Sequence, residues 1–190
     1  MEVGAVIQFE GRDYRIVRRF FRSKGGRRQQ LLETPPRRVE SRRTYYVVED
    51  ALGKLFWVKE YTDPTFGEGA QSEYAEALKL QGLTGYKEHD IRAVHIFAIS
   101  GARILMELLQ GYEPLTRLSL IQETKTLIRV LLLAWLREHP DIDISHDFGA
   151  PNTLVRRARQ VSVRLVDFEV VSNYDNRKRW SGFLKEFLGK

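Results

Sequence analysis

Three pairs of short apolar runs, each joined by a turn that contains glycine, constrain the fold of this chain most strongly. The paired runs are Val6–Phe9 with Tyr14–Val17, Thr44–Glu49 with Leu55–Glu60, and Ile91–Ile99 with Arg103–Leu108. Runs of β-branched and aromatic residues on both sides of such a turn are typical of β-hairpins. We therefore predict that these hairpins form one antiparallel sheet.

Three further segments favour helices. Ala70–Leu80 predicts a short helix, and Thr116–Glu138 predicts a long helix that a His-Pro pair ends. The part of the long helix from Leu127 to Leu136 is apolar nearly all round, so we expect it to be deeply buried. A last helix is expected around Trp180–Phe187. With 190 residues, 43% of them hydrophobic, the chain can bury one sizeable core, and we predict an α+β fold.

Positive charge is concentrated near the N-terminus. Between Gly11 and Arg43 the chain has twelve basic and three acidic residues, whereas the net charge of the whole chain is only +6. Residues 23–43 contain Gly25-Gly26 and Pro35-Pro36 and show no clear period, so we predict a loop there. Two interpretations stay open: the basic segment contacts a polyanion through its phosphate groups, or it is a solvated surface loop.

Other features exclude several classes of site. The chain has no cysteine, which excludes disulfides and thiolate metal sites, and its four histidines are too scattered to suggest a zinc site. No run approaches the roughly 20 apolar residues that a membrane-spanning helix needs. The N-terminal residues also lack the basic-then-apolar order of a secretory signal. We expect a cytoplasmic protein, and attachment to the inner face of the membrane stays open.

The segment from Ile144 to Val171 carries the residues best suited to chemistry. Asp147 is followed five positions later by Asn152, and the apolar runs within 153–166 predict two strands that lead to Asp167. Phosphoryl transfer needs charge neutralisation and a carboxylate beside the attacking hydroxyl, and Mg²⁺ prefers oxygen ligands. The pattern predicts Asp147 as the catalytic base and a metal site of Asn152 and Asp167. The alternative is that Asp147 and Asn152 are ordinary turn residues.

These strings resemble motifs of the protein-kinase-like superfamily. SHDFGAPN at 145–152, followed by VDFE at 166–169, resembles its catalytic loop and metal-binding motif, and KLFWVKEY at 54–61 resembles its third strand. Only about twenty residues follow the second string. The chain is therefore more similar to the compact, atypical branches, namely the lipopolysaccharide (Kdo/heptose) kinases and the small Bud32/Rio-type kinases.

The resemblance implies roles for a lysine and a glutamate. Lys59 would hold the α- and β-phosphates of ATP and contribute to catalysis, since it matches the lysine of the third strand. The helix expected at 70–80 falls where the family places the glutamate that pairs with this lysine. We choose Glu73, because Ala77, one turn further on, shares its face of the helix, and Glu76 is the alternative.

The same resemblance implies further nucleotide contacts. ILMELLQGYEPL, from residue 104, resembles the strand and hinge against which adenine lies. Met106 would be the gatekeeper, and Glu107 and Leu108 would offer backbone groups to the base. Gly25 and Gly26 lie near the place of the glycine-rich loop that covers the phosphates in the family.

As a whole, the resemblance implies a minimal two-lobed kinase-like domain. Residues 1–108 would form a nucleotide-binding lobe of antiparallel sheet and one helix, and 109–190 a reduced, mainly helical catalytic lobe. Its expected activity is that of an ATP- and Mg²⁺-dependent phosphotransferase or ATPase. The acceptor is open: a glycan, a lipid-linked sugar, or a protein or RNA. The alternative function is a non-catalytic kinase-like module whose Arg-rich loop docks nucleic acid or another polyanion.

Overall fold

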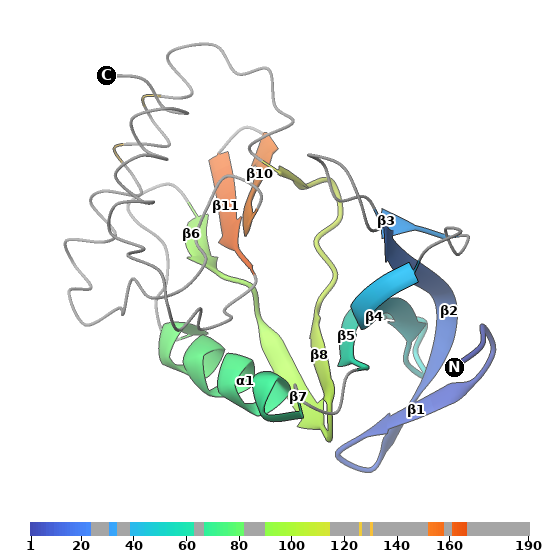
Figure 1. Ribbon diagram of the computed structural model, residues 1–190. Helices are drawn as coiled ribbons and strands as arrows, with labels where there is room; N and C mark the ends of the chain where they lie inside the picture. The colour runs from blue at the N-terminus through green and yellow to red at the C-terminus, as the bar shows by residue number, and fades with distance from the viewer. Residues whose placement is uncertain are drawn as a thin grey trace. The chain divides into compact units, whose positions relative to one another are not determined.

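The computed structural model describes residues 1–23, 31–33, 39–62, 67–81, 90–114, 126, 130, 152–157 and 161–166, and all structural statements below concern these residues. The chain divides into two compact units, which we describe separately (Figure 1). The first unit contains Met1–Tyr74 and His95–Leu108, and the second contains Ala75–Val94 and Leu109–Lys190. The roles assigned to 1–108 and 109–190 as lobes stay predictions.

The described residues form one continuous helix and two sheets. The first unit holds the strands β1 (Val6–Phe9), β2 (Arg12–Ser23), β3 (Leu31–Leu32), β4 (Val39–Glu49), β5 (Leu55–Tyr61), β7 (Ile96–Ser100) and β8 (Arg103–Glu107). The second holds the strands β6 (Asp90–Ala93), β9 (Glu113–Pro114), β10 (Thr153–Arg157) and β11 (Val161–Leu165). The helix α1 (Gly67–Gln81) begins in the first unit and ends in the second.

The sheet of the first unit is antiparallel throughout. Its strand order is β1-β2-β4-β5-β8-β7, and β3 pairs with β2. The prediction of an N-terminal antiparallel sheet is confirmed. The edge strands β1 and β7 contact each other, so the sheet curves around the apolar side chains of one face. The buried residues of this core are Ile7, Phe9, Tyr14, Ile16, Tyr46, Val48, Phe56, Val58, Ala98 and Leu105.

Two turns show why the chain reverses where the sequence predicts hairpins. Glu10 and Gly11 join β1 to β2, and both have positive φ angles, 50° and 75°. A two-residue turn of this kind matches the twist of the strands that it connects. In the next hairpin, Oδ1 of Asp50 accepts hydrogen bonds from the backbone N–H groups of Leu52 and Lys54, each at 2.9 Å. An aspartate that bonds to its own turn in this way favours chain reversal between β4 and β5.

The basic segment is more regular than its sequence predicts. The sequence predicts a loop over 23–43, but β3 lies within this range and β4 begins at Val39. The loop prediction is therefore wrong for Leu31–Leu32 and for 39–43, while 24–30 and 34–38 lie outside the described residues. β4 pairs with β2 on one side and β5 on the other. This pairing is made by hydrogen bonds between backbone groups, which do not depend on the charge of the side chains. The many charged residues in this segment therefore do not indicate that it forms strands.

The second unit contains a four-stranded sheet in the order β6-β11-β10-β9. β10 and β11 are the two strands predicted within 153–166, and they pair as an antiparallel hairpin, while β6 runs parallel to β11. The prediction of one strand over Ile91–Ile99 is wrong, since β6 and β7 join different sheets. The backbone changes partner between Val94, whose N–H donates to the carbonyl of Leu165, and His95, whose carbonyl accepts from the N–H of Glu107. Apolar runs alone do not specify which strand will be the neighbour.

Only one predicted helix falls well within the described residues. α1 matches the helix predicted at 70–80 and extends it at both ends. Of the long helix predicted at 116–138, Thr126 and Val130 are described and helical, and Val130 is 52% exposed, so the predicted deep burial does not hold there. The helix predicted near the C-terminus lies outside the described residues. The described part of the chain beyond Leu108 is mainly strand and does not support a mainly helical lobe.

Among the described residues, no helix is both long and apolar enough to span a bilayer.

Candidate functional site

Lys59 lies on the central strand β5, on the face opposite to the apolar core. Side chains alternate along a strand, so the core residues Phe56 and Val58 point to one face and Trp57, Lys59 and Tyr61 to the other. β5 pairs with β4 on one side and β8 on the other. As a result Lys59 is only 4% exposed, which is unusual for a lysine.

A buried ion pair neutralises this lysine. Nζ of Lys59 lies 2.7 Å from Oε2 of Glu73, and Glu73 is 1% exposed. Glu73 comes from α1, whose fully buried Ala70 and Ala77 lie three residues before it and four after it, so the three share one face of the helix. Charges removed from water to this degree require a partner. The structure thus brings together Lys59 and Glu73, and the role of this pair towards a nucleotide stays a prediction.

Tyr61 is a third member of this buried cluster. Its hydroxyl donates a hydrogen bond to Oε2 of Glu73, the oxygen that also accepts from Lys59. Tyr61 is 4% exposed, and the guanidinium of Arg43 lies 5.5 Å from the centre of its ring. Tyr61 is not among the site residues predicted from the sequence, because the predicted strand ends at Glu60. The string KLFWVKEY at 54–61 offers a signal, since a strand that continues to Tyr61 places it two positions after Lys59 and on the same face.

The predicted hinge residues lie at the end of β8. Met106 is buried and stands opposite Trp57 in the register of β5 and β8. The backbone N–H of Glu107 donates to the carbonyl of His95 at 2.8 Å, so this N–H is already used within the sheet. Leu108 follows the strand and is half-buried. Their contacts with a nucleotide base stay predictions.

In the second unit, Asn152 stands at one end of the β10–β11 hairpin. Its backbone carbonyl accepts a hydrogen bond from the N–H of Val166 at 3.0 Å, one step beyond the pairing of Thr153 with Leu165. The other predicted site residues are Asp147, Asp167, Gly25 and Gly26, and all four lie outside the described residues. Among the side chains that are described, no group of three or more His, Asp or Glu could hold a metal ion.

Comparison with known proteins bears on the fold. No protein-family profile matches the chain, and no curated protein matches its sequence. Among solved structures, the chain is similar to the Rio2 kinase of Chaetomium thermophilum in its ADP/Mg²⁺-phosphoaspartate complex, with a TM-score of 0.57 and 14% identity. The match covers 87% of this chain and 63% of the kinase chain. The fold is protein-kinase-like.

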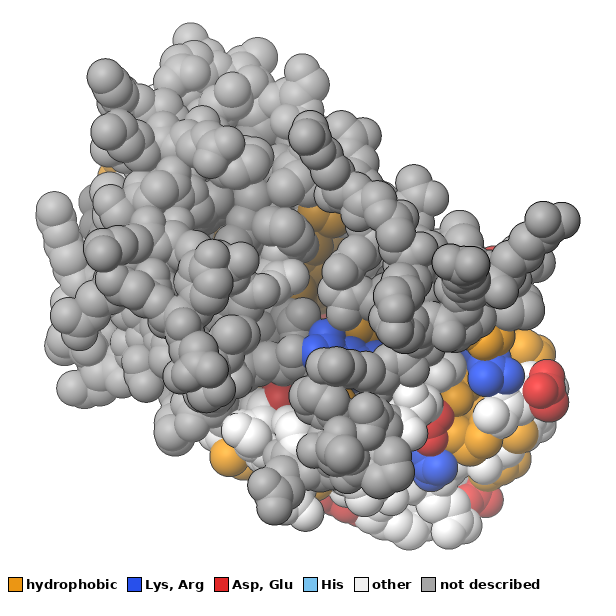
Figure 2. Space-filling view, viewed as in Figure 1, with side chains coloured by type: hydrophobic (Ala, Val, Ile, Leu, Met, Phe, Trp, Pro, Cys, Tyr) orange, Lys and Arg blue, Asp and Glu red, His pale blue; other side chains and the backbone are white. Residues whose placement is uncertain are grey.

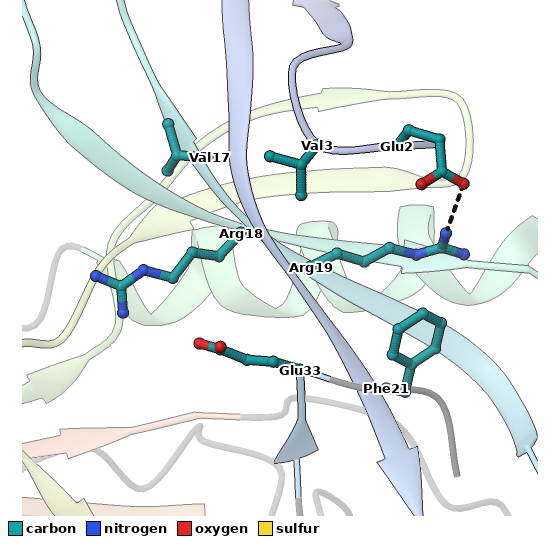
Figure 3. A pocket seen from close by; sticks show the side chains of 7 residues that line it. All are labelled: Glu2, Val3, Val17, Arg18, Arg19, Phe21 and Glu33. Carbon is teal, nitrogen blue, oxygen red and sulfur yellow. Dashed lines mark ion pairs between the residues drawn. The ribbon is translucent and has the colours of Figure 1, made fainter. Parts of the chain in front are cut away.

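The described residues also form a groove that contains none of the predicted site residues. It has a volume of about 430 Å³ and lies along β2 in the first unit. Its lining residues are Glu2, Val3, Val17, Arg18, Arg19, Phe21 and Glu33. Figure 3 shows Arg19 turned towards Glu2, at 3.5 Å, while Arg18 and Glu33 extend to the other side. Two arginines therefore face two carboxylates, and the groove has no excess of charge to attract an anion.

The visible surface of the described residues agrees with this balance. On the face shown in Figure 2, basic, acidic and hydrophobic side chains alternate over the coloured part of the molecule. At least part of the positive charge of the basic segment is compensated locally, for example by the 2.7 Å ion pair of Arg15 with Glu49.

Proposed function

We propose that this kinase-like chain is an ATP- and Mg²⁺-dependent phosphotransferase, a small atypical kinase. The observation that carries the proposal is the buried ion pair of Lys59 and Glu73 between β5 and α1. A buried ion pair contributes little net stability compared with apolar residues of the same volume. Stability alone therefore does not account for this pair, and a role in holding phosphate groups does. The bound ADP and Mg²⁺ named for the Rio2 kinase are consistent with this role.

Within the first unit, Lys59 would bind the α- and β-phosphates, and Glu73 would orient its ammonium group. An ammonium has three donors, so it can bond to a carboxylate and a phosphate together. The N–H of Glu107 already donates to His95, so the carbonyl of Glu107 and the backbone groups of Leu108, next to Met106, would receive the base.

Within the second unit, Asn152 and Asp167 would hold Mg²⁺, which neutralises phosphate charge when bound. Their side chains offer the oxygen ligands that Mg²⁺ prefers. Val166, whose backbone N–H donates to the carbonyl of Asn152, immediately precedes Asp167 in the sequence. Asp147 would accept the proton of the attacking hydroxyl.

A second candidate is the binding of a polyanion by the basic segment. Arg12, Arg15 and Arg18 are exposed on the single strand β2, which favours this proposal. The ion pair of Arg15 with Glu49 weakens it, so the phosphotransferase is the better supported function.

The proposed function predicts Mg²⁺-dependent binding of ATP. Calorimetric titration of the wild-type chain with ATP should show tighter binding with Mg²⁺ than without it. Lys59→Met should weaken binding at least tenfold, the loss expected for a charge-assisted hydrogen bond to phosphate. Asp167→Ala should remove the effect of Mg²⁺.

Lys54→Met is the matched control, since Lys54 is an exposed lysine in the turn before the same strand. Circular dichroism checks that each variant is folded. Equal ATP affinity for the wild type and folded Lys59→Met would contradict the proposal.

A further inference from the structure

We infer that Tyr61 is a positioning residue of this site. Its hydroxyl holds the carboxylate of Glu73, so that the ammonium of Lys59 stays available to a nucleotide phosphate. The inference rests on the proposed function, and it adds a residue that neither the motifs nor the comparisons single out.

The surroundings of Tyr61 fix its side chain in one place. Its backbone N–H donates to the carbonyl of Ala102 at 2.9 Å, which anchors the end of β5. Its ring lies against the first turn of α1, where a Cβ added to Gly69 would come within 3.2 Å of Cε1 of the ring. A larger residue than glycine would push the ring or the helix away. Gly69 thus allows α1 to approach closely enough for the hydroxyl of Tyr61 to reach Glu73.

The shared acceptor gives this contact its chemical meaning. Lys59 and Tyr61 both donate to Oε2 of Glu73, and each of the three residues is at most 4% exposed. Hydrogen bonds to an ionised group in a site of low dielectric are strong. Because the hydroxyl of Tyr61 also donates to the carboxylate of Glu73, it weakens the electrostatic attraction between this carboxylate and the ammonium of Lys59. Without the hydroxyl, Glu73 has one donor fewer, attracts Lys59 more strongly and is less well oriented, and both effects weaken the bond of Lys59 to a phosphate.

A purely structural role for Tyr61 is the rival explanation, and the same sheet supplies its control. Tyr46 on β4 also donates from a buried hydroxyl to a carboxylate, Glu60 of β5, at 2.6 Å. Glu60 points to the face of the sheet opposite to Lys59. Tyr46→Phe therefore removes a tyrosine–glutamate hydrogen bond from the same sheet, on the face opposite to Lys59.

The test compares Tyr61→Phe with Tyr46→Phe by calorimetric titration with MgATP and with adenosine, alongside urea unfolding. Tyr61→Phe should bind MgATP about tenfold more weakly, the loss expected for one charge-assisted hydrogen bond, and adenosine as the wild type does. Tyr46→Phe should keep the wild-type affinity for MgATP even where its stability falls. Gly69→Ala, which keeps the hydroxyl but moves the ring, should also weaken MgATP binding.

The outcomes separate this inference from the proposed function. If the wild type binds MgATP and Tyr61→Phe binds it equally well, the inference is wrong and the proposed function stands. Equal losses in Tyr61→Phe and Tyr46→Phe would show a structural role alone and overturn the inference as well. If the wild type does not bind MgATP, both fall.

Discussion

Two clusters of a tyrosine, a glutamate and a cation lie on opposite faces of the strand β5. On one face, Glu73 accepts from Lys59 and Tyr61, and all three side chains are buried. On the other face, Glu60 accepts from Tyr46 and from Nε of Arg103, each through a different carboxylate oxygen. We call them the helix cluster, because Glu73 belongs to α1, and the sheet cluster, because its members belong to β4, β5 and β8.

The two clusters differ in their contact with water. In the sheet cluster the side chains of Arg103 and Glu60 are 33% and 16% exposed, whereas those of Lys59 and Glu73 are 5% and 2% exposed. Ion pairs that water reaches are screened and contribute little to stability, while a charge left alone in the interior is costly. A tyrosine, a glutamate and a basic residue therefore support neighbouring strands on one face and form a candidate binding site on the other.

The largest difference in stability between the two clusters is expected when the basic residue of each is replaced by methionine. Lys59→Met removes the cation that neutralises the buried carboxylate of Glu73 and should destabilise the chain by about 3–5 kcal/mol. Arg103→Met leaves Glu60 in reach of water and should cost less than about 1 kcal/mol. Urea unfolding of both variants at neutral pH measures the difference. Similar losses in the two variants would mean that burial does not distinguish the clusters.

An intermediate effect is expected for the hydroxyl of the sheet cluster. Burial, followed by the hydrogen bond to Glu60 and the negative charge of Glu60, raises the pKa of Tyr46 well above its usual range. Because the folded-state pKa is raised, the stabilisation is fully present below the unfolded pKa of about 10 and is lost as the pH rises through the folded value.

Absorbance titration of tyrosinate should therefore show Tyr46 ionising only as the chain unfolds in alkali. Tyr46→Phe should cost about 1 kcal/mol at neutral pH, the typical value of one hydrogen bond. The titration of Tyr46→Phe is the comparison. If it lacks a tyrosine that ionises near pH 10 in the folded wild type, the pKa of Tyr46 is not raised and this prediction is wrong.

The smallest effect is expected in a third cluster, in the second unit, where a carboxylate is partly exposed. Burial alone raises the pKa of Asp90, but the hydrogen bond and charge of Arg164, with smaller contributions from Ser162 and Arg92, outweigh it and lower the pKa below 3.8. A lowered folded-state pKa stabilises the chain above the unfolded value, and this contribution is lost as the pH falls through the folded one.

Urea midpoints measured from pH 6 down to about pH 3 test this prediction. The wild type should lose more stability on acidification than Asp90→Asn, whose amide does not titrate. If the wild type and Asp90→Asn lose the same stability on acidification, the ion pair of Asp90 with Arg164 does not stabilise the folded chain.

Local patterns in the sequence predicted a good part of the first unit. The turns at Gly11 and Gly53 and the helix of α1 follow from neighbouring residues, so they could be read without the fold. The choice of Glu73 beside Lys59 rested on a resemblance and on helix periodicity, and the structure brings these two side chains together. The second unit was harder to predict, because β6 finds its partner, β11, about seventy residues further along the chain.

By itself, the sequence determined the elements whose hydrogen bonds close within a few residues, namely the hairpin turns and α1. Only the tertiary structure decided which strands became neighbours, that β6 and β7 joined different sheets, and that Tyr61 shares an oxygen of Glu73 with Lys59. The physical reason is that these contacts join residues distant in the chain. Such contacts depend on burial and on the approach of α1 at Gly69, and no local run of residues encodes either.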